Sequence, residues 1–328
     1  MMNDCYVQLI DGVPCRLKEY FDFSFLSKYG KVFKVYDDQD SGNICFGVAT
    51  THGGADSVTV GVADGGADGG ADGVPCGGAD GGADGGADGV PCGIAYRAAD
   101  CGKRAFVKFA GAPAERSSVC AEEAVARLKG TVSVYHDLAH PALARLMHAE
   151  EIGGGYAAVF EWVDAECMGR QYPQSRERFM QMPLDTRLQV FGDILSFHAH
   201  VAMQGYVAID FYDGSIMYDF DNCRTVICDI EFYAKMPYHN PIGRMWGSSR
   251  FMSPEEFELG AVIDEVTNVY TMGATAFALF GDERDRRLGK WALSEALFQV
   301  AKKAVSDGRS ERQQSIEQFI AEWRAVEP

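Results

Sequence analysis

Short apolar runs of strand length dominate the first half of the chain. Residues 31–36 and 44–48 have the pattern of two hairpin strands, joined by the polar turn 37–43. Residues 104–110 alternate between the two faces of a strand and carry a lysine, and residues 154–163 run from a pair of glycines into a strand and a linker. These patterns predict a β-rich N-terminal part.

Two segments show the spacing of amphipathic helices instead. Residues 121–135 and 187–205 each place apolar side chains along one helical stripe. The stripes are formed by Ala121, Val125, Leu128, Val132 and Tyr135 in the first segment and by Leu188, Phe191, Leu195, His198 and Ala202 in the second. The second segment is the longer one and predicts a helix of the C-terminal part.

Two aspartates nineteen residues apart each close a short apolar run, at Asp210 and Asp229. Between them, residues 215–219 and 225–229 flank a polar turn, which predicts a loop, a strand, a tight turn and a second strand. The hairpin would hold both carboxylates at the mouth of one cleft, one able to take a proton and one able to bind a metal ion. Phosphoryl transfer needs this division of roles, because positioning and charge neutralisation supply most of its catalysis.

Three further segments follow the two aspartates along the chain, at residues 247–255, 264–273 and 307–315. In order and spacing they resemble the end of the activation segment, the central helix and the late arginine motif of the protein-kinase family. The Ser-Pro-Glu triplet ending at Glu255 is similar to that family's Ala-Pro-Glu. The resemblance implies a structural ion pair between Glu255 and Arg312.

The resemblance covers roughly residues 25–325. It implies an α+β fold of the bilobed protein-kinase type, with a small β-rich N-lobe at residues 25–163 and a larger, mainly helical C-lobe at residues 164–328. Residues 1–24 would be an N-terminal extension, and a low-complexity insertion at about residues 50–95 would interrupt the N-lobe.

Lys108 is the first residue to which the resemblance gives a role. A lysine in an apolar strand is costly to bury unless it is paired, although it can also lie on the face of an edge strand. In kinases this lysine holds the α- and β-phosphates of ATP and pairs with a glutamate of the next helix. Glu122 is the expected partner here, and the alternative is that the pair is absent. Asp210 would orient the acceptor hydroxyl, and Asp229 would hold magnesium.

The resemblance also assigns a nucleotide pocket. Main-chain groups of Glu161 and Val163 would meet the adenine edge, with Phe160 at the back of the pocket. Glu166 would reach a ribose hydroxyl, and Gly42 would form the turn of the phosphate-covering loop. The plain alternative for this loop is a Ser-Gly-Asn hairpin turn without a binding role.

Several positions depart from the family pattern. Ala-Ile at 208–209 replaces the family's usual His-Arg before the catalytic aspartate. The arginine that would bind a phosphorylated activation segment is therefore absent, so ordering of that segment by phosphorylation is not expected. Tyr212 replaces the usual lysine, and Ser215 replaces the metal-binding asparagine. We expect Asp213 to compensate as a metal ligand, because a carboxylate is a harder oxygen donor than a hydroxyl. The usual Phe-Gly after Asp229 is Ile-Glu, which removes the backbone freedom of the glycine.

The amino-acid composition restricts the kinds of partner that the chain is expected to bind. The net charge of -17 and the pI of about 4.8 argue against binding to nucleic acid or to anionic membranes. No apolar run has the length of a membrane span, and the N-terminus lacks the pattern of a signal peptide. The ten cysteines are scattered, which favours free thiols in a reducing cytoplasm.

A glycine-rich repeat fits no kinase pattern. Residues 61–92 are two sixteen-residue units, each with three Gly-x-Ala-Asp tetrads and one Gly-Val-Pro-Cys. Residues 51–96 contain seven aspartates and no lysine, arginine or glutamate. The repeat itself has few apolar side chains, so it offers little that a core could bury. A calcium-binding β-roll is the specific alternative, but its repeat has a nine-residue period. We interpret the segment as an expanded turn between two strands.

The function that the resemblance implies is transfer of the γ-phosphoryl group of ATP to a serine or threonine of a protein substrate, with Mg²⁺. A small-molecule kinase of the aminoglycoside or choline type is one alternative, although such enzymes usually lack the Ser-Pro-Glu segment and the late arginine. A catalytically weak, kinase-like scaffold is another, suggested by Ser215, Ile230 and the acidic loop at residues 37–43.

Overall fold

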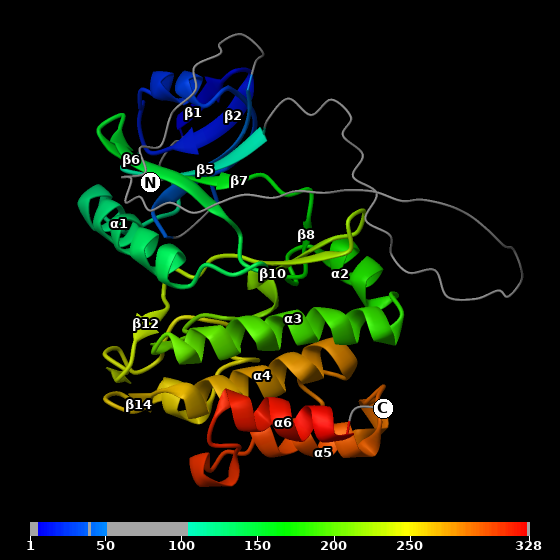
Figure 1. Cartoon of the computed structure of the whole chain (residues 1–328). Helices are drawn as coiled ribbons and strands as arrows, with labels where there is room; N and C mark the ends of the chain where they lie inside the picture. The colour runs from blue at the N-terminus through cyan, green and yellow to red at the C-terminus, as the bar shows by residue number, and fades with distance from the viewer. Residues whose placement is uncertain (1–5, 39–40, 51–103, 327–328) are drawn as a thin grey trace, which may run out of the picture.

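The chain has a mixed α+β structure with a β-rich N-terminal region and a helical C-terminal region (Figure 1). The computed structural model describes residues 6–38, 41–50 and 104–326. The glycine-rich repeat at residues 61–92 lies outside the described residues.

A five-stranded antiparallel sheet forms the centre of the N-terminal region. Its strand order is β3 (Lys31–Tyr36), β4 (Asn43–Ala49), β5 (Arg104–Ala110), β7 (Gly155–Glu161) and β6 (Leu146–Ile152). The strands predicted from the alternating runs are therefore confirmed. The lysine-bearing strand β5 lies in the middle of the sheet, so the edge-strand interpretation of its lysine is wrong.

A hairpin of β1 (Tyr6–Ile10) and β2 (Val13–Leu17) covers one face of the sheet near its N-terminal strands (Figure 1). Phe23, in the segment after the hairpin, packs 5.3 Å from Phe46 and 6.2 Å from Phe109, measured between ring centroids. Residues 10–23 therefore contribute to the same hydrophobic core as the sheet.

The long helix α1 (Ala121–Asp137) lies against the opposite face of the sheet (Figure 1). Its predicted position is confirmed, and Leu128 and Tyr135 are among the residues that it buries. The ring of Tyr135 meets Phe160 of β7 at 4.9 Å. This face of the sheet, with α1 beside it, also carries Lys108.

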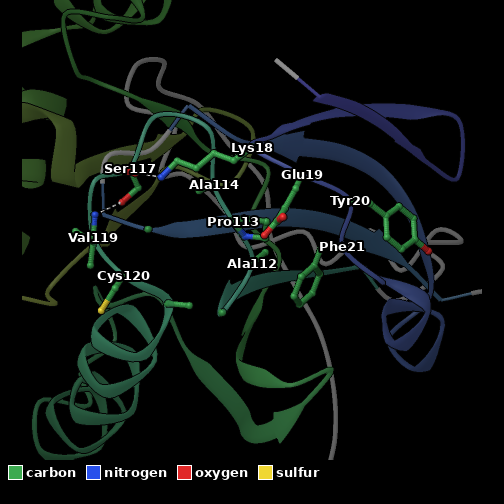
Figure 2. A pocket seen from close by; sticks show the side chains of 13 residues that line it. Lys18, Glu19, Tyr20, Phe21, Ala112, Pro113, Ala114, Ser117, Val119 and Cys120 are labelled. Carbon is green, nitrogen blue, oxygen red and sulfur yellow. Dashed lines mark hydrogen bonds between the residues drawn. The ribbon is translucent and has the colours of Figure 1, made fainter. Parts of the chain in front are cut away.

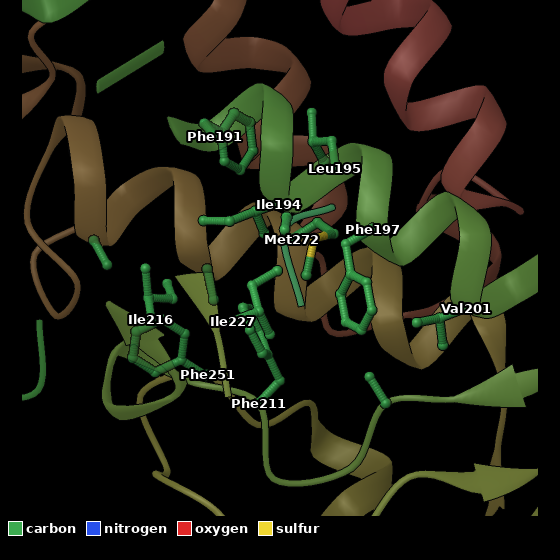
Figure 3. Close-up of a cluster of buried hydrophobic side chains, with 14 of the residues drawn as sticks. Phe191, Ile194, Leu195, Phe197, Val201, Phe211, Ile216, Ile227, Phe251 and Met272 are labelled. Carbon is green, nitrogen blue, oxygen red and sulfur yellow. The ribbon is translucent and has the colours of Figure 1, made fainter. Parts of the chain in front are cut away.

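The C-terminal region is built around α4 (Glu265–Phe280), in which every residue of 267–280 is buried. The helices that surround or precede it are α2 (Pro173–Met180), α3 (Leu184–Met203), α5 (Glu295–Ala304) and α6 (Ile316–Val326). Figure 3 shows how apolar side chains of α3 meet Met272 of α4 and residues of the hairpin that follows α3. Burial on all sides explains why α4 has an almost wholly apolar sequence.

The predicted hairpin between the two aspartates is confirmed. Strands β10 (Ile216–Asp219) and β11 (Arg224–Ile227) pair in antiparallel register, and β8 (Glu166–Cys167) adds a third strand. The carboxylate of Asp219 accepts hydrogen bonds from the backbone N–H groups of the next turn. The remaining short pairs are β9 (Tyr206–Val207) with β12 (Ala234–Lys235) and β13 (Tyr238–His239) with β14 (Val262–Ile263).

The predicted ion pair between Glu255 and Arg312 is confirmed. Arg312 is fully enclosed and donates hydrogen bonds to both carboxylate oxygens of Glu255, at 2.7 and 3.0 Å. Its remaining N–H groups reach backbone carbonyls, including that of Ser306 at 2.7 Å. The pair joins the Ser-Pro-Glu segment to the last part of the helical region.

Candidate functional site

Lys108 is the basic centre of the site. Its Nζ lies 3.1 Å from Oδ1 of Asp229 and also forms an ion pair with Glu231. The lysine is buried, and burial alone would favour its neutral form. Although burial lowers the pKa of Lys108, the charges of Asp229 and Glu231 outweigh it and hold that pKa well above its usual value. The lysine therefore stays charged.

The two predicted aspartates share an uncommon backbone conformation. Asp210 has a φ of 65° and Asp229 a φ of 60°, both in the left-handed region that side chains other than glycine enter at a cost. Strained backbone of this kind concentrates at functional sites. Asp229 lies two residues after the end of β11, and the backbone N–H of Cys228 between them donates a hydrogen bond to the carbonyl of Ser215 at 3.0 Å.

The buried helix α4 fixes the loop that leads to Asp210. The side chain of Asn268 accepts a hydrogen bond from the N–H of Ala208 at 2.8 Å and donates one to its carbonyl at 2.7 Å. Gly247 lies so close that an added Cβ would stand 3.4 Å from Oδ1 of Asp210. The loop that carries Asp210 is therefore held by the core on one side and bordered by the backbone of Gly247 on the other.

Glu231 is the residue of this site that the sequence interpretation missed. Its side chain is only 3% exposed, whereas that of Asp229 is 54% exposed. The side-chain amide of Asn43, at the start of β4, lies 3.4 Å from both oxygens of Glu231. The available signal was a carboxylate between apolar residues, two positions after Asp229.

The structure does not bring Glu122 to Lys108, so the expected pair is corrected. Glu122 lies in the first turn of α1 and is exposed, and the face of α1 that is buried carries no carboxylate. Neighbouring Glu123 is also exposed and pairs with Arg127 at 3.0 Å. Both acidic side chains face away from the lysine because the apolar stripe of α1 takes the inner face.

Asp213 is likewise corrected. It is buried, and Arg250 binds its two carboxylate oxygens at 2.8 and 2.9 Å. Arg176 donates a further hydrogen bond at 2.8 Å, and both arginines also pair with Glu283. With its oxygens engaged by two guanidinium groups, Asp213 does not replace the missing asparagine as a metal ligand.

Ser215 lies between the two aspartate segments. Its side chain is buried, and its hydroxyl lies 3.4 Å from the carbonyl oxygen of Asp210. Its own carbonyl accepts the hydrogen bond from Cys228 described above. Tyr212 lies beside the same loop, and its pKa is raised to a value beyond its usual range, first by burial and then by the charge of Asp210.

The residues expected to bind the nucleotide lie along the end of β7 and the segment after it. Glu161 is the last residue of β7, and its N–H donates to the carbonyl of Arg145 at 3.0 Å. Glu166 forms an ion pair with Arg178 at 2.6 Å. Val163 follows β7 in the connecting segment that leads to β8.

Gly42 occupies the turn before β4 with a φ of 86°, a conformation that favours glycine. An added Cβ would lie 3.0 Å from the Cβ of Ala124 and 3.3 Å from the hydroxyl of Ser117. The turn therefore packs against the first turn of α1.

A separate cavity of about 330 Å³ lies between residues 18–21 and the connection from β5 to α1 (Figure 2). Lys18 donates to the carbonyl of Ser117 at its edge. Lys108, Asp210 and Asp229 are not among its lining residues, so it is distinct from the cluster around the lysine.

The cysteines of the described part of the chain are all free thiols, as the sequence predicted for them. Burial raises the pKa of Cys45, whose neighbour across the strands is Lys108, to about 12. That thiol is therefore protonated at neutral pH and is a packing group.

Comparison with known proteins adds no family. No protein-family model matches the chain, and no curated protein sequence matches it either. Of the helices in the described residues, none combines the length and the apolar character needed to cross a membrane.

Proposed function

We propose that the chain is an ATP-dependent serine/threonine protein kinase with the bilobed fold of that family. The β-rich N-terminal region would be the small lobe and the helical C-terminal region the large one. The observation that carries the proposal is the contact of Lys108 with Asp229, with Asp210 on a neighbouring loop of the same hairpin region. Lys108 comes from β5 and the two aspartates from the segments on either side of the β10–β11 hairpin, in the order that the family resemblance implies.

The chemistry of each residue fits its proposed role. Lys108, which stays charged, would bind the α- and β-phosphates of ATP. Asp210 would accept the hydrogen bond of the acceptor hydroxyl and take its proton. Two hydrogen bonds join the side-chain amide of Asn268 to the backbone N–H and carbonyl of Ala208. They would hold the loop, and with it the carboxylate of Asp210, in place during turnover.

The donor set also suits magnesium. Asp229 offers a half-exposed carboxylate. The backbone carbonyl of Ser215 accepts a hydrogen bond from Cys228, the residue before Asp229, and the hydroxyl of Ser215 would be a second oxygen donor. In the described residues there is no group of three or more acidic, histidine or cysteine side chains placed to hold a metal ion. Proteins often hold Mg²⁺ through one or two carboxylates together with substrate phosphates, so Asp229 and the phosphates of ATP would be the main ligands. Magnesium would neutralise phosphate charge.

The adenine and ribose would lie along the segment after β7. The carbonyl of Glu161 and the main chain of Val163 are proposed to meet the adenine edge, as in the family. Glu166 lies further along the chain and pairs with Arg178 through one carboxylate oxygen. Its other oxygen would accept the hydrogen bond from the ribose hydroxyl. Gly42 would contribute the turn above the phosphates.

A protein acceptor is favoured over a small molecule by one observation. The Ser-Pro-Glu segment is anchored by the buried pair of Glu255 with Arg312, so the region that would present a peptide to Asp210 is fixed. Small-molecule kinases usually lack both halves of this pair.

The test uses purified full-length chain, γ-labelled ATP, magnesium and generic protein substrates, with aminoglycosides and choline as competing acceptors. Asp210→Asn should reduce transfer at least about 10²-fold while leaving ATP binding within about twofold, because the residue meets the acceptor and not the nucleotide. Asp221→Asn, an exposed aspartate in the turn of the same hairpin, is the matched control. Unchanged turnover in Asp210→Asn, or labelling of the small acceptors alone, would contradict the proposal.

A further inference from the structure

The partner of Lys108 comes from an unexpected part of the chain. Both carboxylates that contact its Nζ, those of Asp229 and Glu231, belong to one three-residue segment after β11. In the part of the chain that the structure describes, α1 supplies no ion pair to this lysine, because Glu122 and Glu123 are exposed.

We propose that Glu231 is the positioning residue for Lys108, in the role that a glutamate of the following helix would otherwise have. The proposal rests on the proposed kinase function, because it gives the lysine its phosphates to bind. It differs from that function in naming which carboxylate stays with the lysine when nucleotide is present.

Exposure separates the roles of the two carboxylates. The side chain of Asp229 is 54% exposed and can turn to a metal ion, whereas that of Glu231 is 3% exposed. A buried carboxylate needs a permanent partner, since an uncompensated buried charge is strongly destabilising. Glu231 is therefore the fixed partner, and Asp229 is the one that exchanges the lysine for magnesium.

Asn43 completes the support of this arrangement. Its amide donates to both oxygens of Glu231 at 3.4 Å, and it belongs to the strand next to the one that carries Lys108. The lysine is thus oriented by β4, β5 and the segment after β11. Displacement of α1, whose described side chains form no ion pair with Lys108, would leave both carboxylate partners of the lysine in place.

A double-mutant cycle tests the proposal through the affinity for Mg-ATP, measured by calorimetry on the full-length chain. Glu231→Gln should weaken binding roughly tenfold, the effect of losing one charge-assisted hydrogen bond. In a Lys108→Met background the same change should cause no further loss, because Glu231 acts through the lysine. A merely structural role of Glu231 would give additive losses, which would overturn the proposal.

Two acidic residues of α1 provide the comparison. Glu122→Gln should bind as the unmodified chain does, and Glu123→Gln serves as the control from the same exposed turn. A loss in Glu122→Gln without one in Glu231→Gln would return the partner to α1. Should Glu231→Gln unfold, Glu231→Asp keeps the charge on a shorter side chain and should give a smaller loss of affinity that again disappears without Lys108.

The outcomes also separate this inference from the proposed function. If the unmodified chain binds Mg-ATP and Glu231→Gln binds it equally well, only the inference fails. If the unmodified chain binds no nucleotide, the proposed function fails and the inference with it. A higher magnesium requirement in Glu231→Gln, together with additive losses in the cycle, would make Glu231 a metal ligand and overturn its role toward Lys108.

Discussion

The helical region and the sheet each bury an ion pair, and the two pairs are built differently. In the helical region, Arg312 is completely enclosed and Glu255 is 6% exposed, with Arg309 and Thr267 adding hydrogen bonds to the same carboxylate. Against the sheet, Lys108 faces two carboxylates, and Asp229 is 54% exposed.

The difference separates a stabilising pair from one that can exchange partners. Burial alone would raise the pKa of Glu255, but the hydrogen bonds and charge of Arg312, with the hydrogen bond from Thr267, lower it below its usual value. The cluster of Lys108 has one positive and two negative charges and opens to solvent through Asp229. A satisfied network fixes a structure, whereas an unbalanced and open one can accept a ligand.

The largest effect is expected from breaking the enclosed pair of Arg312 with Glu255. Arg312→Leu leaves Glu255 buried without its main cation and should lower the free energy of unfolding by about 3–5 kcal/mol, measured by urea denaturation. Arg324→Leu, on the exposed side of α6, is the control and should change it by less than about 0.5 kcal/mol. Asp229→Asn should cost less than about 1 kcal/mol, because its pair is half exposed. Equal losses in Arg312→Leu and Asp229→Asn would contradict the distinction.

The second prediction concerns Asp213, whose arginine partners make it a closed cluster too. Asp213→Asn should lower the free energy of unfolding by about 2–3 kcal/mol, because two partly buried guanidinium groups lose a charged acceptor. The magnesium concentration for half-maximal ATP binding should stay the same. Ser215→Ala provides the contrast and should raise that concentration. An increased magnesium requirement in Asp213→Asn would restore the metal-ligand role that the contacts argue against.

The third prediction uses Glu256, which lies beside Glu255 but lacks its cation. Burial raises the pKa of Glu256 to about 7, and the hydrogen bonds from Ser253 only partly oppose this. The unfolded chain releases this proton near pH 4.5 and the folded chain near pH 7. The contribution of protonated Glu256 to the free energy of unfolding is therefore lost as the pH rises between these values.

Glu256→Gln removes that titration. Relative to the unmodified chain, its free energy of unfolding should rise by about 1–3 kcal/mol between pH 4.5 and pH 8. Denaturation curves at four or five pH values measure the difference. A difference that does not depend on pH would mean that the pKa of Glu256 is the same in the folded and the unfolded chain, and would contradict this prediction.

The smallest expected effect concerns the repeat that joins the strands beside the open cluster. Ala49 of β4 pairs with Arg104 of β5, so the ends of the 54 residues between them are neighbours. Deleting residues 61–92 leaves 22 residues and should raise the free energy of unfolding by about 1 kcal/mol through loop-closure entropy. Loss of folding, or stabilisation by calcium in the full-length chain alone, would contradict this.

Periodicity predicted the elements well because each depends on local burial. The strand β5, the helix α1 and the hairpin of β10 and β11 all lie where the apolar patterns placed them. The pair of Glu255 with Arg312 was also predictable, since it followed from the order of several motifs.

The partners of charged residues were harder to predict, because they depend on which side of an element faces the site. Glu122 has the right residue type and roughly the right position, but a rotation of the helix stripe turns it to solvent. Asp213 meets arginines that lie 37 residues away in each direction along the chain, which no local pattern contains. Glu231 was visible only as a departure from a motif.

The pairing of Ala49 with Arg104 has a use in protein engineering. Paired residues of an antiparallel sheet lie about 5 Å apart, so a sensor domain whose own termini are adjacent could replace the repeat without moving the strands. The same two strands carry Asn43 and Lys108 further along. A sensor domain whose termini separate when its ligand binds would pull these strands apart, and so would turn the lysine cluster into the output of an artificial switch.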